Sequence, residues 1–202
     1  PIFYNEWIPT TKVTSPVTRG VCRGTIQVSG RILDADGALV SVRHSWGRKH
    51  TPRYAWGQAQ GVVDSEPFFW EGFSLPLAPD STSRGSLTSC VMTVSGRPYR
   101  FNSVASMTNN RGEIGRRGWH FHCQGRDGLL EGHLEFPSDA LAALRYVQPY
   151  GTVLACLNSM VSSGVLSFIP RGGGKRWSAK LVGDAALEIV SPDLDHGVSV
   201  LA

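Results

Sequence analysis

The hydrophobic positions of this chain form short alternating runs, interrupted every eight to twelve residues by glycine, proline, asparagine or aspartate. With 23 glycines and 12 prolines, this spacing is typical of a β-sandwich or a β-barrel. The predicted strands cover residues 21–29, 31–33, 39–44, 54–63, 68–75, 86–94, 99–106, 118–124, 129–136, 152–157, 164–169 and 177–190, the last broken at 183–184. Tight turns are predicted at 34–37, 95–96, 109–112 and 126–128, because Asn, Asp and Gly tolerate positive φ.

Only residues 138–146 (SDALAALRY) carry a helical pattern. Ser138 is placed to cap this helix, and Pro137 and Pro149 bound it. We therefore expect an all-β fold, a sandwich or a barrel, with one short helix.

Bulk composition limits the classes of function. The net charge is +4, but the basic residues are dispersed, which indicates a solvated mixed surface and no nucleic-acid partner. The sequence contains no run of about 18 apolar residues, the length needed to span a membrane. The four cysteines are widely spaced without a CxxC motif, so we expect free buried thiols and a cytoplasmic location. The chain opens on Pro1, which either removal of an initiator Met or a missing preceding segment explains.

One face of the strand over 54–63 combines rings and amides. Alternation places Tyr54, Trp56, Gln58 and Gln60 together, a pattern that suits a pocket wall with hydrogen-bonding groups at its base. Amides that only tie a barrel together explain the pattern equally well.

The next strand offers a candidate general acid. Glu71 shares a face with Phe69, Phe73 and Leu75, where burial would keep a proton on the carboxyl for transfer to an alkene or a carbonyl. The alternative is a solvent-facing Glu71 that pairs with a surface arginine. Trp70, on the other face of this strand, is a further candidate ring for a pocket wall.

A hairpin is predicted over residues 118–136. One face carries Trp119 and Phe121, which are candidate substrate-contacting rings, and the other places His120 opposite His133 and His122 opposite Glu131. Three histidines on neighbouring strands could hold zinc or iron, although a polar face in contact with water explains the pattern more simply.

Several catalytic signatures are absent from the sequence. The run 172–175 lacks the earlier glycine and the following Ser or Thr of a phosphate loop, and no GxGxxG or GxSxG motif occurs. Nucleotide hydrolysis, dinucleotide redox chemistry and triad hydrolysis are disfavoured. What remains is binding, or a reaction that needs little beyond a shaped cavity.

The segment from His44 to Gln58, HSWGR followed by YAWGQ, resembles the Trp-Gly and Trp-x-Gln motifs of the tocopherol cyclase and carotenoid 1,2-hydratase-like superfamily, which includes fungal decalin-forming Diels–Alderases. Residues 154–156, the strand through Phe168, glycines 172–174 and Trp177 are similar to the C-terminal end of the cyclase. The likeness covers roughly residues 20 to 190, and Trp46, Trp56 and Gln58 fall on its motif positions.

The resemblance implies a pair of lipocalin-like β-domains around a hydrophobic polyene or prenylated substrate, without a cofactor. On this basis we expect a lipocalin-like antiparallel β-barrel with a leading β-hairpin and one short helix, in which residues 1–50 are the end of a first β-domain and residues 51–202 form the barrel. We therefore expect a cofactor-independent cyclase or pericyclase; the alternatives are a hydrophobic-ligand carrier and, third, a metalloenzyme that uses the histidines. Local chemistry makes His44, Arg48 and Glu71 the catalytic candidates. The candidate substrate-binding residues are Trp46, Tyr54, Trp56, Gln58, Trp70, Trp119 and Phe121. These relatives are about twice as long, so a homodimer or a missing N-terminal half is expected.

Overall fold

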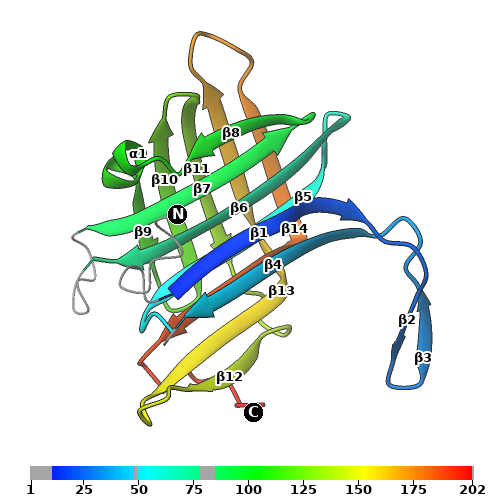
Figure 1. Cartoon of the computed structure of the whole chain (residues 1–202), viewed down its shortest axis with the longest axis vertical. Coiled ribbons are helices and arrows are strands. Elements are labelled where there is room, and N and C mark those ends of the chain that lie inside the picture. Colours follow the sequence, from blue (N-terminus) through cyan, green and yellow to red (C-terminus); the bar gives the residue numbers. More distant parts are fainter. Residues whose placement is uncertain (1–10, 48–49, 78–84, 202) are drawn as a thin grey trace. The chain divides into compact units, whose positions relative to one another are not determined.

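The computed structural model describes residues 11–47, 50–77 and 85–201, and the chain divides into two compact units, 1–50 and 51–202 (Figure 1). Each unit consists of antiparallel strands, and the described residues contain one short helix. The predicted all-β class is confirmed.

The first unit contains two separate strand pairs. β1 (Thr11–Val21) pairs with β4 (Leu39–Gly47), and β2 (Thr25–Val28) pairs with β3 (Arg31–Asp34). Ser29 and Gly30, with φ of 49° and 78°, form the turn between β2 and β3, as expected for a two-residue turn of type I′. The predicted strand over 21–29 is wrong, because the chain leaves β1 at Val21 and turns before β2 begins.

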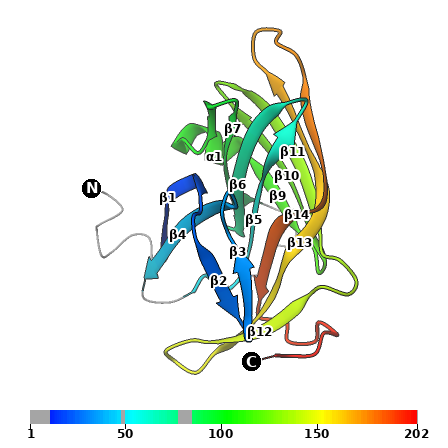
Figure 2. The same cartoon turned by 90° about the vertical axis from the view of Figure 1, so that its right-hand side faces the viewer.

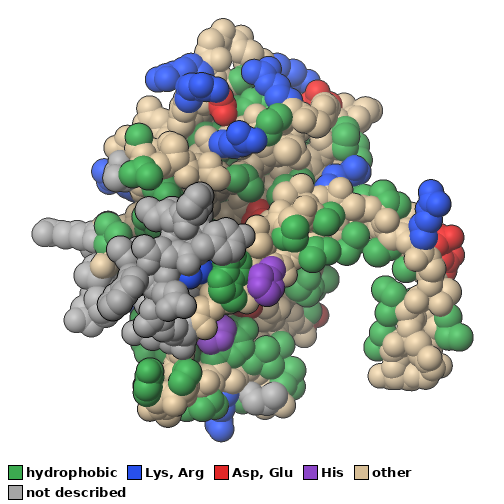
Figure 3. Space-filling view, in the orientation of Figure 1, with side chains coloured by type: hydrophobic (Ala, Val, Ile, Leu, Met, Phe, Trp, Pro, Cys, Tyr) green, Lys and Arg blue, Asp and Glu red, His purple; other side chains and the backbone are tan. Residues whose placement is uncertain are grey.

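Apolar side chains are exposed on the β2–β3 hairpin (Figure 3). They are Ile26, Val28, Ile32 and Leu33. The hairpin therefore has no apolar core of its own.

The second unit is one antiparallel sheet of ten strands with a six-residue helix. Its elements are β5 (Tyr54–Val63), β6 (Glu66–Pro76), β7 (Ser86–Val94), β8 (Arg97–Phe101), α1 (Val104–Asn109), β9 (Arg111–Ile114), β10 (Gly118–Gly125), β11 (Gly128–Glu135), β12 (Ala142–Val147), β13 (Val153–Pro170) and β14 (Trp177–Ser191). The strand order is β8-β7-β6-β5-β14-β13-β11-β10-β9, and β12 pairs with β13. The two longest strands, β13 and β14, lie side by side (Figure 2).

The sheet of the second unit curls until its two edges meet through side chains. Strand β9 contacts β6 and β7, and β10 contacts β7 and β8. The Gly112 amide donates to Ser86 Oγ at 2.7 Å, and Trp119 Nε1 donates to Ser74 Oγ at 2.9 Å. Backbone ladders therefore join the strands in order, and side-chain hydrogen bonds join the edges.

Aromatic rings fill the inside of the curled sheet. The indole rings of Trp70 and Trp119 lie over Gly57 and Gly72, which face each other on β5 and β6. A Cβ atom at Gly72 would lie 2.6 Å from Cys90 Sγ and 3.2 Å from the Trp119 ring. Only glycine therefore fits beneath these two rings.

The helix is not where the sequence predicted it. Residues 142–147 form strand β12, in register with β13 so that Ala143 faces Leu157. The described helix α1 begins inside the predicted strand over 99–106 and extends beyond it, and Ser103 caps it by accepting from the Ser106 amide at 3.1 Å. With six residues, α1 is far shorter than a membrane-crossing helix, and no other described segment forms a helix long and apolar enough for that.

Candidate functional site

Strand β5 separates small residues from large polar and aromatic ones. Ala55, Gly57 and Ala59 face the packed interior, so Tyr54, Trp56 and Gln58 point to the opposite side of the sheet. We call this side of β5, β6, β13 and β14 the outer face. The predicted grouping of these side chains is present, but on the face away from the interior they were expected to line.

Glu71 lies on the same outer face, on strand β6. Its Cα partner across the ladder is Gln58, and its Oε1 accepts a hydrogen bond from Trp56 Nε1 at 3.0 Å. The strand alternation that predicted Glu71 among Phe69 and Phe73 therefore holds, and an indole N–H orients the carboxylate.

A second carboxylate, Glu188 of β14, is the centre of a polar cluster that the sequence analysis missed. Its carboxylate accepts hydrogen bonds from Tyr54 Oη, from Asn158 Nδ2 at 3.0 Å and, more weakly, from Tyr146 Oη at 3.5 Å. The sequence signal that could have identified this cluster is a single glutamate, Glu188, inside the apolar run 185–190. We call Tyr54, Tyr146, Asn158 and Glu188 the Glu188 cluster.

The phenols of the Glu188 cluster and the adjacent Cys156 thiol stay protonated at neutral pH. Burial raises the pKa of Tyr54 and of Tyr146 well above the usual range; the next cause is the charge of Glu188 for Tyr54 and the hydrogen bond with Cys156 for Tyr146. Burial also raises the pKa of the Cys156 thiol to about 12. At neutral pH both phenols are therefore hydrogen-bond donors, and Cys156 is not a thiolate nucleophile.

Three of the predicted pocket rings lie in the interior and fill it. Trp70, Trp119 and Phe121 are at most 5% exposed, with ring centroids 5.0 Å apart for Trp70 and Phe121 and 4.7 Å apart for Trp119 and Phe121. Rings this close leave no space for a guest between them. The expectation that they line a barrel pocket is corrected, because they occupy that space themselves.

Two predicted residues lie in the first unit. His44 and Trp46 are on β4, with stacked rings whose centroids are 5.1 Å apart. Arg48, the third catalytic candidate, lies outside the described residues.

The histidines of the β10–β11 hairpin have the predicted register, with His120 opposite His133 and His122 opposite Glu131. The rings of His120 and His133 stack at 4.8 Å, with 11° between their planes. Lone pairs in the plane of two stacked rings do not converge on one ion, and His133 Nε2 pairs instead with Glu135 Oε1 at 3.0 Å. Within the described residues, no group of three histidine, cysteine or acidic side chains is arranged to hold a metal.

No protein-family model, curated protein or solved structure matches this chain. The outer face, with two carboxylates held by aromatic donors from one strand, is the candidate site for chemistry.

Proposed function

We propose that this protein is a cofactor-independent cyclase that acts on a hydrophobic polyene or prenylated substrate at the outer face. One observation carries the proposal. Glu71 and Glu188 lie on the two strands that flank β5, and each accepts a hydrogen bond from an aromatic side chain of β5, Trp56 or Tyr54.

The strand register sets the spacing of the two glutamates across the sheet. Gln58 of β5 faces Glu71, and Trp56, two residues earlier, faces Glu188. Two strand spacings and a two-residue offset place the Cα atoms of the glutamates about 12 Å apart. An acid and a base at that separation can act on different atoms of one extended molecule that lies over Trp56.

A proton-initiated ring closure fits this arrangement. Glu71 in its acid form transfers its proton to one carbon of an alkene, which leaves a carbocation on the other carbon. A second double bond or a hydroxyl of the same molecule attacks that cation and closes the ring. Glu188 takes up the proton that the new cation releases, so the product is an isomer of the substrate and no electron donor or acceptor is consumed.

The aromatic residues of β5 supply the remaining catalytic contributions. The electron-rich face of Trp56 stabilises a nearby cation, and the flat rings favour a folded substrate conformation. Such positioning supplies roughly 7–11 kcal/mol in the best cases. The resemblance adds support, since Trp56 and Gln58 are the two outer-face residues on its motif positions.

The test is turnover in D₂O of a prenylated hydroquinone and a linear terpenoid polyene, with product isomers separated by liquid chromatography and mass spectrometry. The wild type is expected to give a cyclic product one mass unit heavier than the substrate, because the added hydrogen comes from solvent. Glu71→Gln is expected to lower turnover about 100- to 10,000-fold, the usual contribution of a general acid.

Glu188→Gln and Tyr54→Phe should also slow turnover, and Glu135→Gln, an exposed glutamate of β11, is the matched control. Thermal melts identify variants that fail to fold. Wild-type turnover by folded Glu71→Gln and Glu188→Gln refutes the proposal. Binding of either probe without any product identifies a hydrophobic-ligand carrier instead.

A further inference from the structure

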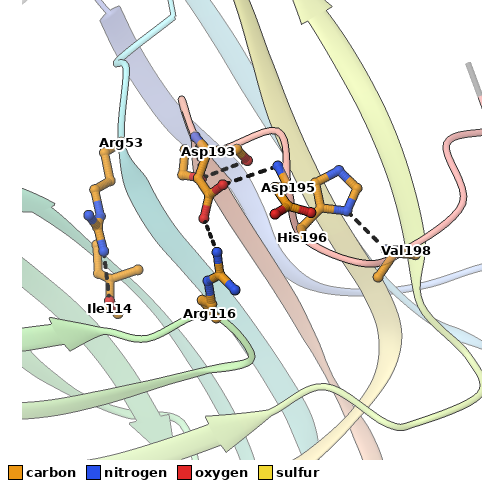
Figure 4. A network of polar contacts seen from close by, with 8 residues as sticks. Arg53, Ile114, Arg116, Asp193, Asp195, His196 and Val198 are labelled. Carbon is orange, nitrogen blue, oxygen red and sulfur yellow. Dashed lines mark hydrogen bonds and ion pairs between the residues drawn. The ribbon is translucent and has the colours of Figure 1, made fainter.

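A small pocket lies at one end of the second unit, separate from the outer face. Ala155 and Leu157 of β13 and Ile189 of β14, from the interior-facing side of the sheet, form its apolar lining. Arg53, Arg116, Asp193 and His196 form its polar part. Figure 4 shows these polar groups and their partners.

Two of the charges in the pocket neutralise each other. Arg116 Nη2 lies 2.8 Å from Asp193 Oδ2, and Asp193 Oδ1 accepts from the Asp195 amide at 3.1 Å. These contacts hold the pKa of Asp193 below its usual value, chiefly through the Arg116 hydrogen bond. The aspartate is therefore ionised and engaged at neutral pH.

Arg53 is the lining cation that is not part of the Arg116–Asp193 pair. Its Nη2 donates to the Ile114 carbonyl at 3.0 Å, and no carboxylate among the described residues pairs with it. Two arginines and one aspartate leave the lining with a net charge of +1. A guanidinium with one neutral partner has donors remaining for an anion.

His196 is another polar residue of the lining. Its Nδ1 accepts from the Val198 amide at 3.3 Å, so Nδ1 carries no proton and the hydrogen of the neutral ring is on Nε2. His196 lies on the other side of the Arg116–Asp193 pair from Arg53 (Figure 4), so Arg53 is the donor available next to the apolar lining.

Size and lining then restrict the ligand. The cavity volume is about 100 Å³, well below the roughly 300 Å³ of a pocket for a drug-sized molecule. A polyene does not fit. The apolar lining formed by Leu157 and Ile189 favours an alkyl group over an inorganic anion, whose whole surface requires polar partners.

We propose that this pocket binds a short aliphatic carboxylate of about four carbons. The carboxylate accepts hydrogen bonds from Arg53, and the alkyl group contacts Leu157 and Ile189. This inference does not depend on the proposed cyclase activity, since the two sites share no residue.

Calorimetric titration of the full chain with butyrate, butan-1-ol and inorganic phosphate tests the proposal. Butyrate is expected to bind with a Kd near 1 mM, and both butan-1-ol and phosphate at least tenfold more weakly. Arg53→Gln should weaken butyrate binding at least tenfold, and Arg53→Lys less, because Lys keeps the charge but lacks the two-pronged donor. Arg126→Gln, at an exposed turn, is the control and should bind as the wild type does.

Equal binding of butyrate by Arg53→Gln and the wild type overturns the proposal, as does phosphate binding as tight as that of butyrate. If Arg53→Gln does not fold, the comparison of butyrate with butan-1-ol on the wild type decides. Equal affinity for these two would show that the charge plays no part.

Discussion

Asn110 connects three strands from opposite edges of the curled sheet through one side chain. Its Nδ2 donates to the carbonyls of Thr88 on β7, at 2.9 Å, and of Phe101 at the end of β8, at 2.8 Å. Its Oδ1 accepts from the amide of Gln124 on β10, at 2.9 Å. The side chain is 2% exposed, so water does not replace these contacts when it is removed.

Replacement of Asn110 by alanine is expected to lower the free energy of unfolding by about 3 kcal/mol. Each of the three hydrogen bonds contributes roughly 0.5–1.5 kcal/mol, and the two carbonyls lie on residues that are fully buried. For a domain of this size, 3 kcal/mol lowers Tm by roughly 6–12 °C.

Asn109→Ala is the matched control, because the neighbouring Asn109 is exposed and donates only to the Ala105 carbonyl at 3.3 Å within its own helix. Urea denaturation followed by tryptophan fluorescence measures both variants. We expect Asn109→Ala to lie within about 0.5 kcal/mol of the wild type. The reasoning is refuted if Asn110→Ala is no less stable than Asn109→Ala.

Two further predictions concern the thiols and an exposed ion pair. Of the four free cysteines, Cys22 should react first with an aromatic disulfide reagent in the native protein. The other three, Cys90, Cys123 and Cys156, are buried, and burial raises the pKa of the Cys90 and Cys156 thiols. Fast reaction of two or more thiols would contradict this prediction. Arg116→Gln should reduce thermal stability at pH 7 but not at pH 2. The pKa of the Asp193 carboxyl is lowered in the folded protein, chiefly by Arg116. Such a group stabilises the fold above the usual pKa near 4, and the stabilisation is lost as the pH falls through the lowered pKa. A difference between Arg116→Gln and the wild type that persists at pH 2 would show that the pair is not the cause.

Local patterns predicted the β10–β11 hairpin down to its register. Alternation over residues 118–136 separates apolar from polar positions cleanly, so only one pairing buries Trp119 and Leu134 together. The turn at 126–127 has two residues, as the Arg-Asp-Gly sequence indicates.

The helix predicted over residues 138–146 is wrong, because pairing with a neighbouring strand outweighs the helix propensity of this segment. Residues 138–146 contain good helix formers, but the ladder with β13 binds residues 142–147 as a strand. The segment of α1 has the opposite character, since its helix begins at a local cap on Ser103 within a predicted strand. Both errors concern short segments, in which a few tertiary contacts outweigh intrinsic preference.

The face of the sheet that carries the candidate site could not be predicted, because strand β6 has apolar residues on both faces. Phe68 and Trp70 lie on one side and Phe69 and Phe73 on the other, so alternation groups the residues but does not say which group meets the interior. The Glu188 cluster depends on contacts between residues 30, 42 and 134 positions apart, and no local pattern contains them.

The small residues of β5 explain why its large polar and aromatic side chains lie on the outer face. A Cβ atom at Gly57 would lie 2.7 Å from Leu134 and 3.1 Å from the Trp70 ring, so the interior accepts nothing larger at this position. Because strand side chains alternate, a packed face of Ala55, Gly57 and Ala59 forces the larger residues between them to the other side. The same alternation that closes the interior with tryptophan rings therefore sets Tyr54 and Trp56 beside two carboxylates, Glu188 and Glu71, on the outer face.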